Sequence, residues 1–426
     1  MTEVRFFCGI LWNSTMQLFR IDKLPMWVNT LTLVYILTIF ILKPVHNIAF
    51  IALALLGVGY GVYLLKNKQN QQLTQSDKWF CYAILFYILV RLITFCFHDD
   101  RTRHIDTVIQ LLLFLPVFFL LREFKITLKT LFFAIPCSAI IAFTVAAYDR
   151  LYLGLRLPFD NMIHIQAGDM ALSLGWLSFV LFFYAFTKKE KLLTALCILG
   201  ILSGLGASVL STARGGWVSL PPVLFAIFFI FRQQVSKKFL AGLCVLIFVG
   251  ATVLFVVPQT QVSKRIEQAQ NDIALYLEGN PNTSIGARFE MWKGAWMMTQ
   301  ERPLAGVGED AFKAYFKKYA NEGKIAKSAS IYAHAHNLYL DNLAKNGILG
   351  LLSLFAIFLV PLYTFLKSVV TTNLEVKTIA ALGVTHILAV MFYGTSEAFF
   401  SLHTTQMFYF FLLFTLLAMI SHRKNI

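Results

Sequence analysis

Long apolar segments separated by short polar loops run along most of the chain. Twelve of these segments have the length and composition of α-helices that cross the roughly 30 Å hydrocarbon core of a membrane. They cover residues 27–43, 46–65, 78–97, 105–121, 127–148, 168–186, 192–211, 217–231, 238–257, 348–366, 376–394 and 403–421. The pattern predicts an all-α polytopic membrane protein with about twelve transmembrane helices.

Composition agrees with this prediction. Hydrophobic residues make up 58% of the sequence and charged residues only 14%, whereas about a quarter of an average soluble domain is charged. The net charge is +15, but the basic residues are spread over many short loops rather than gathered in one patch. That distribution argues against nucleic-acid binding.

The basic residues are unevenly divided between the two alternating sets of loops. One set, which includes both ends of the chain, holds nineteen lysines and arginines, and the other holds six. Because short cytoplasmic loops are enriched in these residues, both termini are predicted to be cytoplasmic. The long polar segment 258–347 then lies outside, between an N-terminal bundle at 1–257 (about nine helices) and about three C-terminal helices at 348–426.

The external segment has a helical pattern of its own. Residues 262–278 form a predicted amphipathic helix, and further helices are expected at 285–300 and 309–320, with a bend at Gly306-Val307-Gly308 between the last two. A short helix near 337–345 is expected to stop at Asn346-Gly347. The segment is therefore predicted to be an ordered helical loop.

Two histidines, His334 and His336, lie near the end of this loop in the run YAHAHN. Imidazole transfers protons near neutral pH, so His336 is a candidate general base or phosphate ligand at the membrane surface. The alternative is a histidine that only completes a helix cap. Residues two apart point to opposite sides of a helix, so the spacing does not predict a metal site and no metal is expected.

Three arginines are candidates for anion binding. Arg214 lies in a short external turn, STARGGW, whose glycines allow backbone amides to approach an anion near a helix N-terminus. This favours anion binding over a simple interface anchor. From the residues alone, Arg288 is more simply explained as a helix-surface residue than as a second anion ligand. Arg156 is external and flanked by apolar residues, and its pattern is unspecific.

Four further ionisable residues, Arg91, Asp169, His386 and Glu397, lie within or at the edge of predicted spans. Charge in hydrocarbon is costly, so such groups usually face a cavity or one another. Glu397 is near the outer end of its helix and could orient His336 or an acceptor. A pairing of Glu397 with Arg91 is also compatible with the sequence.

Taken together, these motifs resemble the O-antigen ligase superfamily. The resemblance rests on the polytopic layout, the STARGGW turn, the string from Arg288 through Trp292 and Pro303 to Gly306-Val307-Gly308, and the run from His334 to Gly347. It is firm over about 205–350 and general elsewhere. The superfamily also contains O-antigen polymerases and bacterial protein O-oligosaccharyltransferases.

The resemblance implies a GT-C-like membrane enzyme in the bacterial inner membrane, with its active site in the periplasm. The implied reaction is an inverting, metal-independent transfer of an undecaprenyl-diphosphate-linked glycan to a sugar hydroxyl of lipid A-core, without a cofactor. The matching positions give His336 as the catalytic residue and Arg214 and Arg288 as diphosphate ligands. Accessory residues would be Arg156, His334, Asn337 and Glu397.

Two other classes of function stay open. A protein O-oligosaccharyltransferase or an O-antigen polymerase would use the same donor with a different acceptor. A transporter would need charged groups near the membrane midplane, for which Arg91, Asp169 and His386 are candidates. A large ordered external loop has no obvious use in a transporter.

Overall fold

The computed structural model describes residues 23–41, 43–69, 71–98, 100–102, 105–159, 162–256 and 262–424. Within these ranges the secondary structure is helical, without strands. The α-helices are α2 (Leu24–Thr38), α3 (Lys43–Lys66), α4 (Gln75–His98), α5 (Ile105–Glu123), α6 (Leu128–Ala147), α7 (His164–Thr187), α8 (Lys191–Leu210), α9 (Leu220–Phe231), α10 (Lys237–Val256), α11 (Val262–Leu277), α12 (Ser284–Glu301), α13 (Phe312–Asn321), α14 (Leu338–Val369), α15 (Leu374–Tyr393) and α16 (His403–Lys424). The all-α prediction is confirmed.

Every predicted span coincides with a helix, but the helices differ in length. Nine of those in the described ranges are long and apolar enough to cross a membrane, namely α3–α8 and α14–α16. Two apolar segments are shorter, Leu24–Thr38 and Gly215–Phe231, the second of which begins with the 3-10 helix η4 (Gly215–Ser219). α10 covers most of the span expected at 238–257. The number of transmembrane helices, twelve, therefore stays a prediction.

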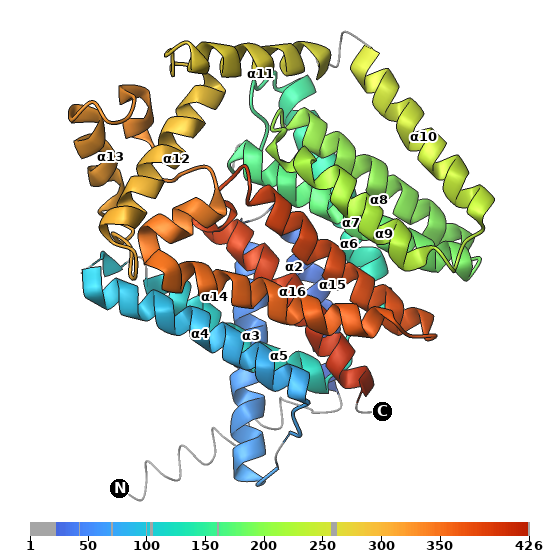
Figure 1. The fold of residues 1–426 in the computed structure, drawn as a ribbon. Coiled ribbons are helices and arrows are strands. Elements are labelled where there is room, and N and C mark those ends of the chain that lie inside the picture. Colours follow the sequence, from blue (N-terminus) through green and yellow to red (C-terminus); the bar gives the residue numbers. More distant parts are fainter. Residues whose placement is uncertain are drawn as a thin grey trace, which may run out of the picture.

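The bundle is built around α7, which packs against α6, α8 and α15 (Figure 1). Nearly all of α7 is buried, including Asp169 near its start. Apolarity does not explain this position, because α3 and α8 are more apolar and less buried. Small residues do, since Gly168 and Gly175 of α7 let Ser211 and Gly204 approach closely.

The helices between α10 and α14 form a second, smaller core. α11, α12 and α13 lie together near the end of the bundle where α14 begins (Figure 1). Met291 and Met298 of α12 pack with Phe312, Phe316 and Tyr319, all at most 1% exposed. Thr283 caps α12 by accepting a hydrogen bond from the amide of Gly286. Gly306 and Gly308 have φ of 67° and 85°, so the predicted bend is confirmed.

The helix stop predicted at Asn346-Gly347 is confirmed. Gly347 has a positive φ of 65° and a ψ of −164°, so its backbone is not helical, and α14 consists of two helices that meet at a kink at this residue. The amide of Ile348 donates to the carbonyl of Pro303 at 2.8 Å, so the connection after α12 supplies a partner that the helix itself cannot. A Cβ at residue 347 would lie 2.2 Å from the carbonyl oxygen of Leu304.

The two ends of the bundle have different polar contacts. At the end with most basic loops, Asp77 and Arg122 form a buried ion pair, with Oδ2 and Nε 3.1 Å apart. Ser421 at the end of α16 donates to Asp77, and Arg423 pairs with Glu375. These contacts gather loops that the sequence places on one side of the membrane. At the other end lie the histidine loop (residues 332–337), the turn that contains Arg214, and the helices α11–α13.

Candidate functional site

His336 and Glu397 are in direct contact. Nδ1 of His336 lies 2.8 Å from Oε2 of Glu397, and the two side chains are 14% and 4% exposed. His336 belongs to the loop between the 3-10 helix η6 (Lys327–Ile331) and α14, whereas Glu397 follows α15. A carboxylate only accepts, so Nδ1 donates and Nε2 is left as the acceptor of the neutral ring.

The residues after His336 are fixed to the end of α15. Asn337 is the N-cap of α14, where its side-chain oxygen accepts from the amides of Tyr339 and Leu340, both at 3.0 Å. Its Nδ2 donates to the carbonyl of Thr395 at 3.1 Å. The amide of Leu338 donates to the carbonyl of Gly394 at 2.7 Å. Asn337 therefore has a structural part in joining the two elements that carry His336 and Glu397.

The protonation states follow from burial and neighbouring charges. Burial alone would raise the pKa of the Glu397 carboxyl. The hydrogen bond and charge of His336, with the charges of His334 and Arg288, hold the pKa of Glu397 below its ordinary value of 4.5. Burial lowers the pKa of His334 below 6.5, and the neighbouring His336 adds to that shift. At neutral pH the site therefore contains a carboxylate and a neutral His334.

The argument from spacing against a metal site assumed a helix at His334 and His336, and that assumption was wrong. The segment is a non-helical loop, and His336 has a left-handed φ of 48°. The two rings consequently face each other, with centroids 4.2 Å apart. One ligand atom from each of His334, His336 and Glu397 lies within 4.8 Å of the others, so these residues could hold a metal ion. That no metal takes part stays a prediction.

The Arg214 turn lies against the same site. A Cβ on Gly215 would lie 2.5 Å from Oγ of Ser396, the neighbour of Glu397 in the chain. A Cβ on Gly216 would lie 2.1 Å from Oδ1 of Asp169. The glycines therefore allow the turn to approach α7 and the segment after α15 closely. Arg214 and His336 lie at the same end of the bundle.

Arg288 approaches the site from the group of helices α11–α13. It lies on α12 and is partly buried. Its positive charge helps to lower the pKa of Glu397, which places it within electrostatic range of the His336–Glu397 pair. A simple position on the external surface, which the residues alone favoured, does not account for this proximity.

Three other candidates lie apart from this cluster. The Arg156 side chain is exposed, and among the described residues no hydrogen bond or ion pair joins it to His336, Glu397 or Arg214. Arg91 does not pair with Glu397. Its Nη1 lies 3.0 Å from Oε1 of Glu309. Nε2 of His386 lies 3.0 Å from the carbonyl oxygen of Tyr409, deep in the bundle.

A set of charged residues next to the histidine loop was not predicted from the sequence. Lys345 lies between Asp341 and Glu309, with N–O distances of 2.9 and 3.0 Å. The i,i+4 spacing of Asp341 and Lys345 on a predicted helix was a usable signal. Glu309 had no such signal, because its partners are distant in sequence.

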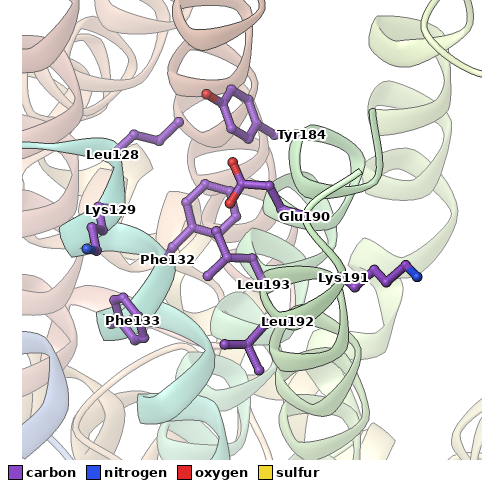
Figure 2. A pocket seen from close by; sticks show the side chains of 9 residues that line it. All are labelled: Leu128, Lys129, Phe132, Phe133, Tyr184, Glu190, Lys191, Leu192 and Leu193. Atoms are coloured by element: carbon purple, nitrogen blue, oxygen red, sulfur yellow. The ribbon is translucent and has the colours of Figure 1, made fainter. Parts of the chain in front are cut away.

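A cavity of about 580 Å³ lies elsewhere, between the start of α6 and the connection from α7 to α8 (Figure 2). Leucine and phenylalanine side chains, with Lys129, Glu190 and Lys191, form much of its lining (Figure 2). It is at the end of the bundle where Arg122 pairs with Asp77, and it contains none of the candidate residues. Its size alone does not make it the reaction site.

Comparison with known proteins gives a family and a relative. A family model described as O-Antigen ligase matches residues 195–355, a range that contains Arg214, Arg288 and His336. A Haemophilus influenzae protein described as uncharacterized is 36% identical over 384 residues, which is 90% of this chain and 96% of that protein.

Proposed function

Because the chain belongs to the O-antigen ligase superfamily, we propose that it transfers an undecaprenyl-diphosphate-linked O-antigen glycan to a sugar hydroxyl of lipid A-core. A membrane glycosyl transfer of the O-antigen ligase or polymerase type follows from the family itself. The donor, the acceptor and the assignment of the site to the periplasmic side of the inner membrane are parts of the proposal. The basic loops gathered at the opposite end support the orientation.

The observation that carries the proposal is the pairing of His336 with buried Glu397 beside the Arg214 turn. Because Nδ1 of His336 donates its hydrogen bond to Glu397, Nε2 is the unprotonated nitrogen of the ring. Nε2 can therefore accept the proton of the acceptor hydroxyl. The acceptor oxygen attacks the anomeric carbon from the face opposite the diphosphate. The bond from that carbon to the diphosphate oxygen breaks, and its electron pair leaves with the diphosphate.

Arg214 and Arg288 have the chemistry to stabilise the departing diphosphate. Guanidinium groups bind phosphate oxygens through two parallel hydrogen bonds and stay charged at every relevant pH. Charge placed where the leaving group develops negative charge lowers the barrier without a metal. Membrane anchoring of both substrates adds proximity.

A transfer assay with purified protein tests this function. Lipid-diphosphate glycan and lipid A-core are mixed with the protein in the presence of a chelator. The product, lipid A-core that carries the glycan, is resolved on a gel. Product formed in the chelator supports a metal-independent ligase. Activity that needs an added divalent ion would contradict the mechanism. No product with lipid A-core, but transfer to a pilin-type protein or to a second glycan, would indicate an oligosaccharyltransferase or a polymerase instead.

A further inference from the structure

Four charged side chains form a continuous chain from a membrane helix to the histidine loop. Nη1 of Arg91 on α4 lies 3.0 Å from Oε1 of Glu309. Oε2 of the same carboxylate lies 3.0 Å from Nζ of Lys345, and that ammonium lies 2.9 Å from Oδ2 of Asp341. Charges alternate along the chain, so each is balanced by its neighbours.

The series of charged side chains ends at Asp341, which binds the backbone next to His336. Oδ1 of Asp341 accepts a hydrogen bond from the amide of Ala335 at 2.9 Å. Ala335 is fully buried, and the next residue, His336, has a φ of 48°. A left-handed φ is unfavourable for a residue with a Cβ, so surrounding contacts must impose it.

Contacts therefore fix the histidine loop on both sides of His336. Glu397 and the carbonyls of Gly394 and Thr395 fix His336 and the residues after it. Asp341 fixes the residue before it. Both carboxylate oxygens of Asp341 are needed, because one faces the Ala335 amide and the other faces Lys345.

We propose that Asp341 is a positioning residue for His336, oriented by Lys345 within the chain of charges that begins at Arg91. The proposal deepens the proposed function and rests on it for the role of His336. Glu309 lies in the connection between α12 and α13. The packing of that connection on α4 is therefore coupled to the position of His336.

Substitution by asparagine separates this role from simple packing. In Asp341→Asn a single oxygen remains, and the charged Lys345 competes for it with the Ala335 amide. The amide NH2 then faces the Ala335 N–H, and the hydrogen bond that holds the loop is lost. In the double variant D341N/K345M the competitor is gone, so the oxygen can return to Ala335, while Glu309 keeps Arg91 as its partner.

The experiment compares D341N, D341N/K345M and a control, Asp77→Asn. The control breaks an equally buried ion pair with Arg122 at the other end of the bundle. Hydrogen exchange of the segment 332–338 is measured in the full-length protein, with glycan transfer per folded molecule as the second readout. D341N should speed exchange and slow transfer by about 10²-fold, the scale of a misplaced catalytic group. D341N/K345M should recover both at least several-fold, and D77N should change neither.

Exchange or transfer in D341N equal to wild type would overturn the proposal, and so would a double variant worse than the single one. The exchange readout needs no substrate. If wild-type protein transfers no glycan, the proposed function fails, while exchange still decides whether Asp341 positions the loop.

Discussion

Glu397 Oε2 lies 2.8 Å from His336 Nδ1, although 61 residues separate them in the chain. The contact fixes the imidazole by its inner nitrogen and directs the other away from the carboxylate. Glu397→Gln keeps the size but loses the charge, so the imidazolium formed in the reaction is less stabilised. We expect transfer to fall by about 10- to 100-fold with a smaller change in KM. Steady-state assays of purified protein check this, and an unchanged kcat would mean that the pair has no catalytic part.

Arg214 tests the need for a planar cation. Arg214→Lys keeps the charge but loses bidentate geometry, and Arg214→Ala loses both. We expect the lysine variant to lie between wild type and alanine, with alanine reduced by roughly 10²-fold. In cells, Arg214→Ala and His336→Ala should each leave lipid A-core uncapped on gels while the protein remains in the membrane. Normal capping of lipid A-core by both variants would contradict the proposed mechanism.

Gly216 tests the close approach of the turn to α7. A Cβ there would lie 2.1 Å from Oδ1 of Asp169, so Gly216→Ala must displace one of them. We expect a loss of stability of about 1–3 kcal/mol and loss of transfer. Gly59→Ala on α3 is the matched control, since nothing lies within 4 Å of its Cβ position. A Gly216→Ala protein as active and as stable as the control would show that the turn has room to move.

The pH dependence of stability follows from His334. Its folded pKa is below 6.5, so the unfolded chain takes up a proton first as the pH falls. The contribution of the neutral ring is complete above pH 6.5 and is lost as the pH drops below it. Between pH 7.5 and 5.5 the melting temperature of wild type should therefore fall more than that of His334→Phe. Parallel curves for the two proteins would exclude this contribution.

Orientation is tested by labelling. The structure places Ile331 near the candidate site and Lys189 in the connection from α7 to α8, and both are exposed. The five described cysteines are free, so a cysteine-free background is a reasonable start. A membrane-impermeant maleimide applied from outside should label Ile331→Cys at once and Lys189→Cys only after permeabilisation. The reverse pattern would place the site in the cytoplasm.

Periodicity and charge were sufficient to predict the helices and the order of the elements between α10 and α14. They worked because lipid forces backbone hydrogen bonds into helices and external packing uses regular apolar spacing. They also predicted the break at Gly347, which is non-helical and separates the two halves of α14. They could not predict that the second half begins against the connection after α12, where the carbonyl of Pro303 accepts from the amide of Ile348.

For the site, residue type was more informative than spacing. His336, Arg214 and Glu397 were identified by their chemistry, and the structure brings them to one end of the bundle. The relation of His334 to His336 could not be deduced, because it depends on the left-handed φ of His336. The Arg91–Glu309 pair was also beyond sequence, since 218 residues separate its members.

Two independent requirements meet at residue 347. Its φ of 65° is accessible to few residues, and the carbonyl of Leu304 occupies the volume of a Cβ. Rotation to a negative φ would change the angle between the two halves of α14. Asparagine, which commonly replaces glycine in left-handed conformations, is therefore also excluded. Saturation mutagenesis of this codon, selected for function, should return glycine alone.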